Sequence, residues 1–375
     1  MINLQTNYPL APLTTFKIGG PAKFFAEIVS QEELGEVLLF AKKNNLKTLL
    51  LGGGSNMLIS DKGFGGLVIS INTLGLEKTK EGDDWVEVKI GAGEIWDKVV
   101  DYAVGNNYWG IENLSYIPGK VGAFAVQNVG AYGQEASQVV AEVEAYDTIN
   151  NQIVFLSNQA CGFSYRTSIF NSLDKGRYLI LKVLLRLSKI SKPNVSYPDL
   201  QKVFAGQSNI KLSDVRQAII KVRNKKFPYP YTVGAKGSAG SFFKNFLLTK
   251  AEYDSLEKNI ALNLPLVLPE LIRIKNKFPA DNLIKIPTAF LLEVCGVKGL
   301  SVGGAKINDD QPLVILNDSN KATAADVLVL VQEVRKIVED KTGLRLQLEP
   351  ELIGFEKQDL LGYGFTETEA SRYAN

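Results

Sequence analysis

Hydrophobic positions along the first hundred residues switch between the periods of strands and helices. Residues 22–29, AKFFAEIV, are typical of a strand, and Ser30 with Glu33 forms a capping box for a helix that closes near Asn44 and Asn45. The apolar positions of this helix recur at helical spacing: Leu34, Val37, Leu38 and Ala41. The apolar stretch LKTLLL then runs into GGGSN, so this part of the chain predicts a βαβ unit.

The same alternation continues in the middle of the chain. Residues 85–90, WVEVKI, alternate as a strand, and residues 94–105 predict a helix that ends at a glycine. Residues 151–187 are mostly strand-like. From about 188 to 212 the composition turns to Pro, Ser, Asn and Gly, which predicts a long loop at a domain boundary.

Two further helices and a strand are expected in the second half. One helix begins near Ser213 and stops before Pro228. The other is capped by Thr323 and Asp326, ends at Gly343, and turns five apolar side chains inward: Val327, Leu330, Val331, Val334 and Val338. After it, LRLQLEPE alternates strictly and predicts a strand whose polar face carries Arg345, Gln347, Glu349 and Glu351.

Composition excludes several kinds of chemistry. The chain contains no histidine, which rules out a Ser-His-Asp triad, a histidine-ligated metal and a histidine proton shuttle. Cys161 and Cys295 lie far apart without a CxxC motif, so we expect neither a thiolate cluster nor a disulfide framework. No metal site is predicted, and any redox chemistry needs a bound cofactor.

Length and charge indicate a globular protein with small-molecule ligands. At 375 residues the chain is long enough for two or three domains, and 42 Lys and Arg against 40 Asp and Glu create no field that favours nucleic acid or an anionic membrane. MINLQTNYPL lacks the features of a secretory signal, and YLILKVLLRL contains Lys182 and Arg186 and is too short to span a bilayer. We expect a cytoplasmic protein, and a monomer because no large apolar surface stretch is evident.

Two glycine-rich segments are candidates for phosphate binding. The first follows a buried strand and comprises Gly52, Gly53, Gly54, Ser55 and Asn56. Successive backbone N–H groups can surround an anion there, although the Rossmann and P-loop patterns are missing and a flexible hairpin turn explains this loop alone equally well. The second segment, residues 117–135, spaces four glycines among small and amide residues. Together the two segments fit a flavin dinucleotide bound between two α/β subdomains.

Six further segments follow one another along the chain: TTFKIGGPA (14–22), LGGGSNMLISDKGFGGLVI (51–69), GFSYRTSIF (162–170), AGSFFKN (239–245), KGLSVGGA (298–305) and LEPE (348–351). With this ordered set, the chain closely resembles the UDP-N-acetylenolpyruvoylglucosamine reductase (MurB) family, in its type I branch. The resemblance implies an α+β fold, with a two-part FAD-binding domain of the PCMH/vanillyl-alcohol-oxidase type and a C-terminal substrate-binding domain. The implied ranges are 1–75 and 76–212 for the FAD-binding subdomains, with a mobile substrate loop at about 188–212, then 213–345 for the substrate-binding domain and 346–375 for a C-terminal strand and tail that return to the active site.

The same resemblance implies an activity. Enzymes of this family contain FAD, take electrons from NADPH, and reduce UDP-N-acetylglucosamine enolpyruvate to UDP-N-acetylmuramate in peptidoglycan synthesis. The hydride goes to C3 of the enolpyruvyl group and the proton to C2. Carried over to this sequence, Ser241 is the proton donor, and Arg166 and Glu351 hold the substrate carboxylate and stabilise the enolate.

These residue types suit that chemistry. Hydride arrival at one carbon builds negative charge that spreads into the carboxylate, and a planar guanidinium such as Arg166 can bind that carboxylate bidentately. Glu351 can donate a hydrogen bond to it when protonated, and the Ser241 hydroxyl can protonate carbon if Lys226 or Lys244 stabilises the alkoxide. Taken singly, each residue has an alternative role: Ser241 as a turn former, Arg166 in a structural salt bridge or a contact to cofactor phosphate, and Glu351 as a polar position on a strand.

The resemblance also implies the binding residues. The cofactor would be bound by Gly52, Gly53, Gly54, Ser55, Asn56, Pro118, Gly119, Gly122, Ala123, Val126, Gln127 and Gly130. The nucleotide sugar would be bound by Tyr132, Tyr197, Lys226, Asn245 and Gln311, with Tyr197 on the loop that closes over the uridine diphosphate.

Some positions depart from the family's pattern. TTF stands where NTF is usual, Ala123 replaces a hydroxyl residue that often contacts phosphate, Phe246 replaces a proline, and Ile353 replaces an arginine. None of these removes a catalytic group. Two other functions stay open at this point: a flavin oxidase or dehydrogenase of the same architecture with another substrate, and a non-catalytic flavin or nucleotide-sugar binding protein.

Overall fold

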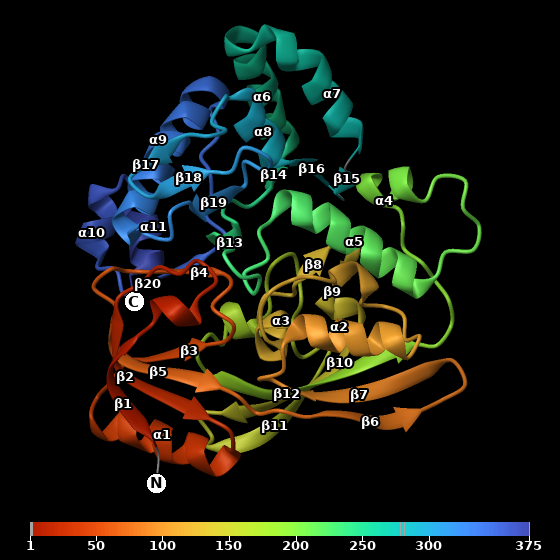
Figure 1. Ribbon diagram of the computed structural model, residues 1–375. Helices are drawn as coiled ribbons and strands as arrows, with labels where there is room; N and C mark the ends of the chain where they lie inside the picture. Colours follow the sequence, from red (N-terminus) through yellow and green to blue (C-terminus); the bar gives the residue numbers. More distant parts are fainter. Residues whose placement is uncertain (1–2, 278, 281, 375) are drawn as a thin grey trace. The chain divides into compact units, whose positions relative to one another are not determined.

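The computed structural model describes residues 3–277, 279–280 and 282–374 (Figure 1). The chain forms two compact units, each assembled from several segments. The first unit comprises Met1–Tyr8, Ala22–Gly53 and Gly65–Lys225, and the second comprises Pro9–Pro21, Gly54–Phe64 and Lys226–Asn375. This division falls at other positions than the four ranges expected from the sequence, and those ranges stay a prediction about the domains.

A four-stranded sheet with strand order β1-β2-β5-β3 forms one part of the first unit. Its elements are β1 (Leu4–Pro9), β2 (Pro21–Ile28), β3 (Thr48–Leu51), β5 (Phe64–Ile71) and helix α1 (Gln31–Lys43). The strand, helix and strand expected over this stretch are present, and α1 buries Leu34, Val37 and Ala41 in the core beside the sheet. Ser30 caps the helix as predicted, but Glu33 reaches back to the N–H group of Val29 instead of closing the box on Ser30.

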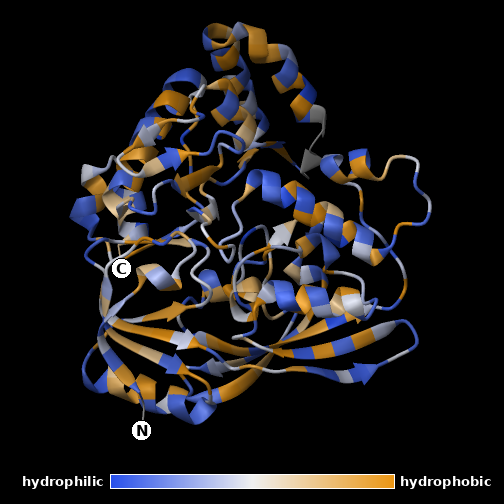
Figure 2. Ribbon diagram, in the orientation of Figure 1, coloured by the Kyte–Doolittle hydropathy of each residue, from blue (hydrophilic) through white to orange (hydrophobic). Residues whose placement is uncertain are grey.

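A five-stranded antiparallel sheet with order β11-β10-β12-β7-β6 forms the larger part. Its strands are β6 (Leu76–Glu81), β7 (Trp85–Gly91), β10 (Val140–Asp147), β11 (Gln152–Ser157) and β12 (Tyr178–Ser188). Helices α2 (Trp96–Gly105) and α3 (Val121–Val126) lie over one face (Figure 1). Figure 2 shows hydrophobic and hydrophilic bands alternating along β7, and the hydrophobic residues of β7, β10 and β12 pack with Trp96 and Phe124 in one core. Residues 158–177, inside the stretch expected to be mostly strand, form turns, an isolated bridge and a short 3-10 helix instead.

The rest of the first unit carries the expected long loop. It contains β8 (Gly130–Ala131), β9 (Gln134–Glu135), α4 (Pro198–Val203), α5 (Leu212–Lys226), and the 3-10 helices η2 (Glu112–Leu114), η3 (Ala136–Gln138) and η4 (Ile169–Asn171). The loop therefore holds a short helix, α4, that its polar composition did not reveal. Leu200 of α4 and Val215 and Ile219 of α5 share a small core with Tyr132.

Asp147, at the end of β10, is buried against Arg177 of the same unit. Its two carboxylate oxygens accept hydrogen bonds from Arg177 Nε at 3.2 Å and Nη2 at 2.9 Å, and these bonds hold the pKa of Asp147 well below its usual range. A carboxyl whose folded-state pKa is lowered stabilises the fold above its unfolded pKa, and this stability is lost as the pH falls.

We therefore expect Asp147→Asn to lower the melting temperature near neutral pH. The difference from the unsubstituted protein should shrink below about pH 4, where the unfolded carboxyl is protonated. Melting temperatures of both proteins, measured from neutral pH to below about pH 4, give this difference. A difference that is independent of pH would show that the charge of Asp147 is not what stabilises this part of the fold.

The second unit contains small sheets covered by helices. Sheet orders are β13-β19-β18-β17, β14-β16-β15 and the parallel pair β20-β4. The strands are β4 (Met57–Ile59), β13 (Gly237–Ser241), β14 (Phe246–Leu248), β15 (Pro279–Ala280), β16 (Leu283–Ile286), β17 (Ser301–Val302), β18 (Ala305–Ile307), β19 (Val314–Asn317) and β20 (Glu351–Ile353). The helices are α6 (Lys250–Asn263), α7 (Leu268–Lys277), α8 (Thr288–Val294), α9 (Ala324–Thr342), α10 (Lys357–Gly362) and α11 (Glu367–Tyr373), with 3-10 helices η1 (Ala11–Leu13) and η5 (Pro265–Val267).

Helix α9 has the boundaries that the sequence predicts. Thr323 and Asp326 form a complete capping box, and Gly343 ends the helix with a left-handed φ of 72°. The expected strand LRLQLEPE is wrong in one respect: residues 344–350 form no regular strand and have only an isolated bridge at Leu348, and β20 begins at Glu351. The alternation is nevertheless observed, since Leu346 and Leu348 are buried.

No helix among the described residues is long and apolar enough to cross a membrane.

Candidate active site

The two glycine segments predicted to bind the cofactor meet in the first unit. A Cβ atom built on Gly53 would lie 2.6 Å from Gly119 Cα, and one built on Gly52 would lie 3.0 Å from Ala123 Cβ. Only glycine fits at position 53, because real Cβ atoms do not approach backbone so closely. The adjoining loops thus expose backbone where side chains would block a pyrophosphate, so the residues present fit a dinucleotide such as FAD.

Backbone hydrogen bonds fix the second glycine segment on the turn after β7. Gly119 O accepts from Trp96 N at 3.0 Å, Gly122 N donates to Ala92 O at 3.0 Å, and Val121 N donates to the Glu94 carbonyl at 2.9 Å. Small residues are required here as well, because a Cβ on Gly122 would lie 3.0 Å from Ala92 Cβ. The candidate residues in the middle of the segment, Val126 and Gln127, form the end and the C-terminal cap of α3.

Lys120 is a cation in this segment that the sequence interpretation did not include. Its ammonium donates to Ser70 Oγ at 3.3 Å and to Asn72 Oδ1. Burial lowers the pKa of Lys120, since few polar groups replace its hydration. The signal for it was a lysine inside a run of small residues, and it places a positive charge between Gly119 and Gly122.

Arg166 occupies a strained turn beside the same segment. Ser164 and Thr167 exchange backbone hydrogen bonds at 2.9 and 3.0 Å, and Arg166 between them has a left-handed φ of 55°. Its Nη2 donates to Gly130 O at 2.9 Å, and its guanidinium lies 5.2 Å from the centroid of the Tyr165 ring. Non-glycine residues rarely adopt this conformation without compensating contacts, and such strain concentrates at functional sites.

Two more hydrogen bonds attach this turn to the second glycine segment. Asn128 Nδ2 donates to Ser164 O at 3.0 Å, and Ser168 Oγ donates to Val126 O at 2.6 Å. The first unit therefore brings the candidate Arg166 next to the candidate cofactor residues Val126 and Gly130.

Tyr132 and Tyr197, both expected to bind the nucleotide sugar, are also brought together. Their ring centroids are 5.1 Å apart in an edge-to-face arrangement. Tyr132 is buried with a left-handed φ of 49°, and burial raises the pKa of its hydroxyl to about 12. Tyr197 caps the N-terminus of α4 and is 38% exposed, so it offers a ring to a ligand.

Ser241 is the last residue of β13 in the second unit. The ladder between β13 and β19 is interrupted after Ser238, Gly240 has a left-handed φ of 72°, and Ser241 pairs with Val314 beyond this irregularity. Such a bulge redirects the side chains that follow it. Ser241 is half-buried, whereas the two phenylalanines after it are buried in the core.

Glu351 lies in the chain segment next to Ser241. Phe242 O accepts from Glu349 N at 3.0 Å, Lys244 N donates to Gln347 O at 2.9 Å, and Phe243 and Leu348 form an antiparallel bridge. Extending this register by two residues puts Ser241 across from Pro350, the residue before Glu351. The second unit therefore brings the candidate acid and the candidate proton donor into adjacent segments.

Asn56 of the first glycine loop forms hydrogen bonds with the segment that carries Glu351. Its Nδ2 donates to Glu349 O at 3.3 Å, and its carbonyl oxygen accepts from Glu351 N at 3.0 Å. Gly54, at the start of this part of the loop, has a left-handed φ of 59°, and a Cβ there would lie 2.3 Å from Leu13 O. The loop therefore also positions the segment that carries Glu351.

The remaining substrate candidates have structural contacts in the second unit. Asn245 Oδ1 accepts from Thr288 N at 3.0 Å, so this side chain also holds the start of α8. The carbonyl oxygen of Lys226 accepts from Asn308 Nδ2 at 3.2 Å, and that of Gln311 accepts from Val314 N at 2.9 Å. Both side chains are half-buried. Nothing in these contacts assigns the three residues to a ligand.

The fold and the glycine segments define a class of protein, and comparison with known families agrees. A family model described as an FAD binding domain matches residues 22–154. The protein is therefore a flavoprotein with an α+β FAD-binding domain followed by a C-terminal domain. The crystal structure of UDP-N-acetylenolpyruvylglucosamine reductase (MurB) from Thermus caldophilus shares this fold, with a TM-score of 0.61 and 23% identity over 94% of this chain and 99% of that one.

Closer relatives identify the family. A model described as the C-terminal domain of UDP-N-acetylenolpyruvoylglucosamine reductase matches residues 230–353. The enzyme of that name from Flavobacterium johnsoniae is 36% identical over 356 residues, which cover 94% of this chain and 100% of the relative. The one from Thermobifida fusca is 38% identical over 357 residues, 93% of this chain and 97% of the relative. The chain belongs to the UDP-N-acetylenolpyruvoylglucosamine reductase family.

Proposed function

We propose that this protein reduces UDP-N-acetylglucosamine enolpyruvate to UDP-N-acetylmuramate, with NADPH as the electron source and FAD as the bound cofactor. The observation that carries the proposal is the pairing of residues 242–244 with residues 347–349, because it brings the segments of Ser241 and Glu351 side by side. A hydroxyl and an acid in neighbouring segments suit a reaction that adds hydrogen across a carbon–carbon double bond next to a carboxylate.

Within this proposal the adjoining glycine loops would hold FAD, which, once reduced by NADPH, would supply the hydride that goes to C3 of the enolpyruvyl group. The protein's own residues manage the charge that results. Arg166, which the turn Ser164–Thr167 fixes, binds the substrate carboxylate and gains attraction as negative charge spreads into it. Glu351 shares in binding this carboxylate and, when protonated, donates a hydrogen bond to it.

Ser241 then completes the reduction. Its hydroxyl proton goes to C2 as the C–H bond forms, and the serine oxygen is left as an alkoxide that takes a proton back from solvent. Lys226 and Lys244 are the cations proposed to stabilise this alkoxide while it exists. The hydride and the proton together account for the two hydrogens that the double bond gains.

Five side chains bind the nucleotide sugar in this proposal. Tyr132 and Tyr197 contribute aromatic surface for the nucleotide, and Lys226 contributes positive charge for its diphosphate. Asn245 would use its Nδ2 group, because its Oδ1 atom is engaged by Thr288 N. Gln311 is the remaining hydrogen-bonding side chain.

We expect the purified protein to be yellow and to oxidise NADPH rapidly only when the enolpyruvyl nucleotide sugar is present. Flavin absorbance and the decrease of NADPH absorbance measure the two properties. Turnover of NADPH with another acceptor but not with this nucleotide would favour a flavin oxidase or dehydrogenase of the same architecture. Bound flavin with no turnover of any acceptor would favour a non-catalytic binding protein.

A further inference from the structure

Asn113 is a buried side chain that links two parts of the first unit. Its Nδ2 donates to Tyr132 O and to Asn194 O, both at 2.7 Å. Its backbone N–H donates to Gln134 Oε1 at 2.8 Å, and Gln134 Nε2 donates to Glu112 Oε1 at 2.8 Å. A single amide group, itself held in a buried network, thus joins the turn at Tyr132 to the start of the substrate loop.

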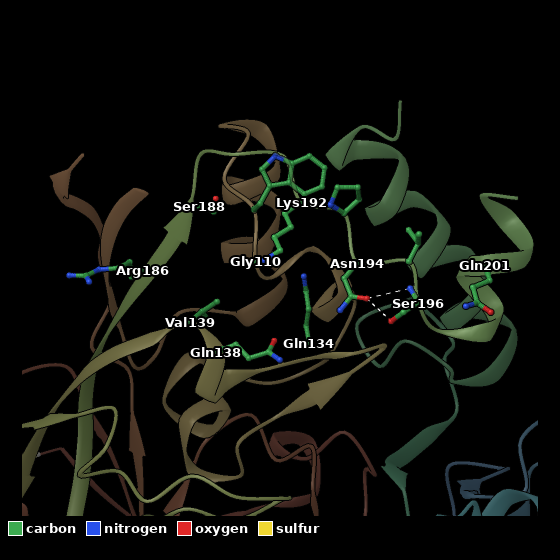
Figure 3. Close-up of a pocket in the computed structure, with 13 residues that line it drawn as sticks. Gly110, Gln134, Gln138, Val139, Arg186, Ser188, Lys192, Asn194, Ser196 and Gln201 are labelled. Carbon is green, nitrogen blue, oxygen red and sulfur yellow. Dashed lines mark hydrogen bonds between the residues drawn. The ribbon is translucent and has the colours of Figure 1, made fainter. Parts of the chain in front are cut away.

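Asn194 forms a second connection at the same point. Its Nδ2 donates to Gly133 O at 2.9 Å, and its Oδ1 accepts from Ser196 N at 3.3 Å and Ser196 Oγ at 2.8 Å (Figure 3). Gly133 has a left-handed φ of 85°, and a Cβ there would lie 2.9 Å from Asn194 Nδ2. Asn194 in this position and the left-handed φ both favour glycine at position 133, and the Asn194 side chain shapes the turn that leads to Tyr197.

Hydrophobic packing supports the start of the substrate loop, around Asn194, on one side only. Val195 joins the core around Tyr132 and Leu200. On the other side lies a cavity of about 790 Å³ whose lining includes Trp109, Pro193, Asn194 and Gln201 (Figure 3). None of the site residues expected from the sequence lines this cavity. On the side of this cavity, the hydrogen bonds of Asn113 and Asn194 add to the packing of Val195 in holding the start of the loop against the body of the unit.

Burying the Asn113 side chain also costs folding free energy. Its Oδ1 atom has no hydrogen-bond partner among the described residues, and an unsatisfied buried oxygen destabilises the fold. A leucine of similar size would avoid that cost. It would also leave the carbonyl groups of Tyr132 and Asn194 without their donor, so the amide is suited to holding these two segments together.

We propose that Asn113 and Asn194 form a latch that positions Tyr197 against Tyr132 for binding of the nucleotide sugar. This inference rests on the proposed function, in which these two tyrosines contact the substrate. Asn113 and Asn194 are positioning residues, because they act through the tyrosines. Loss of the latch lowers the fraction of molecules whose loop is positioned to bind the nucleotide sugar. The apparent affinity for this substrate then falls, although the groups that contact it are unchanged.

Two variants of the full-length, flavin-loaded protein test the latch. Asn194→Ala removes the donor to Gly133 O, and Asn113→Asp places a carboxylate oxygen against the carbonyl groups of Tyr132 and Asn194. We expect each to raise the KM for the enolpyruvyl nucleotide about tenfold, as for one or two lost hydrogen bonds, and to leave kcat within about twofold. Gln201→Ala, beside the same cavity but outside the latch, is the matched control and should leave both constants unchanged.

Hydrogen exchange measured by mass spectrometry supplies a readout that does not depend on activity. Peptides covering residues 194–204 should exchange faster in both latch variants than in the unsubstituted protein or in Gln201→Ala, whereas peptides from β12 should be unaffected. Retained flavin absorbance shows that a variant has folded, and if Asn113→Asp does not fold, Asn194→Ala alone decides the result.

The outcomes separate the latch from the proposed function. Unchanged exchange in the latch variants, or an equal change in Gln201→Ala, would overturn the latch. Faster exchange with an unchanged KM would overturn its role in substrate binding. If the unsubstituted protein does not turn over the nucleotide, the proposed function fails, and the exchange experiment still decides whether the latch holds the loop.

Discussion

Replacing Ser241 with alanine should slow the oxidation of NADPH by the enolpyruvyl nucleotide by about 10²- to 10⁴-fold, the range that a positioned general acid contributes. The substitution removes the proton that goes to C2 but none of the groups that bind the cofactor in the proposed mechanism. Reduction of the bound flavin by NADPH in the absence of nucleotide should therefore proceed at its normal rate. Stopped-flow absorbance measures this first half-reaction, and steady-state assays measure the whole cycle.

Ser238→Ala is the matched control for this experiment. Ser238 lies on the same strand, β13, and its backbone N and O bond to Thr15 independently of its hydroxyl. We expect nearly normal turnover. Equal loss of both half-reactions in Ser241→Ala, or a similar loss in Ser238→Ala, would contradict the role of Ser241 as proton donor.

Gly53→Ala should produce protein with little bound flavin. The new Cβ would lie 2.6 Å from Gly119 Cα, so the two glycine segments would have to separate before either could approach a pyrophosphate. Overpacking of this kind costs about 1–3 kcal/mol, which corresponds to a loss of flavin affinity of about 5- to 200-fold. The ratio of flavin to protein absorbance after gel filtration, followed by titration with FAD, measures the effect.

Gly105→Ala provides the comparison. Gly105 is the last residue of α2, a Cβ there meets nothing within 4 Å, and alanine is the better helix former. This variant should keep its flavin, and its melting temperature should be unchanged or slightly higher. A Gly53→Ala protein with full flavin content would show that the close approach of the two loops is not needed for cofactor binding.

Local signals in the sequence predicted the elements whose ends are determined locally. Helix α9 is an example, since the capping box at Thr323 and the glycine at 343 lie within the helix termini themselves. The stretch LRLQLEPE shows the limit. Its alternation correctly predicted which side chains are buried, but the backbone partners of residues 347–349 lie about a hundred positions earlier, at residues 242–244, and no local pattern reveals them.

In the candidate site, too, the sequence indicates some features, whereas others depend on contacts that form only on folding. The sequence indicates the close approach of Gly53 to Gly119, because glycines follow a strand there and only backbone can approach backbone so closely, whereas cofactor binding by these glycines stays a prediction. The left-handed conformation of Arg166 could not be read from the sequence, because arginine carries no preference for it. Lys120, Asn113 and Asn194 were not predicted, since their roles depend on carbonyl and hydroxyl partners that come close only after folding.

The way the chain is shared between the two units limits how the protein can be dissected. The second unit needs Pro9–Pro21 and Gly54–Phe64 as well as everything after residue 225, because Phe16 belongs to its core and β4 is the parallel partner of β20. A fragment that starts at residue 226 would lose the neighbour of the strand that carries Glu351. Expressing the C-terminal portion by itself is therefore an unsuitable route to a minimal substrate-binding module, whereas a graft that keeps both N-terminal pieces preserves its architecture.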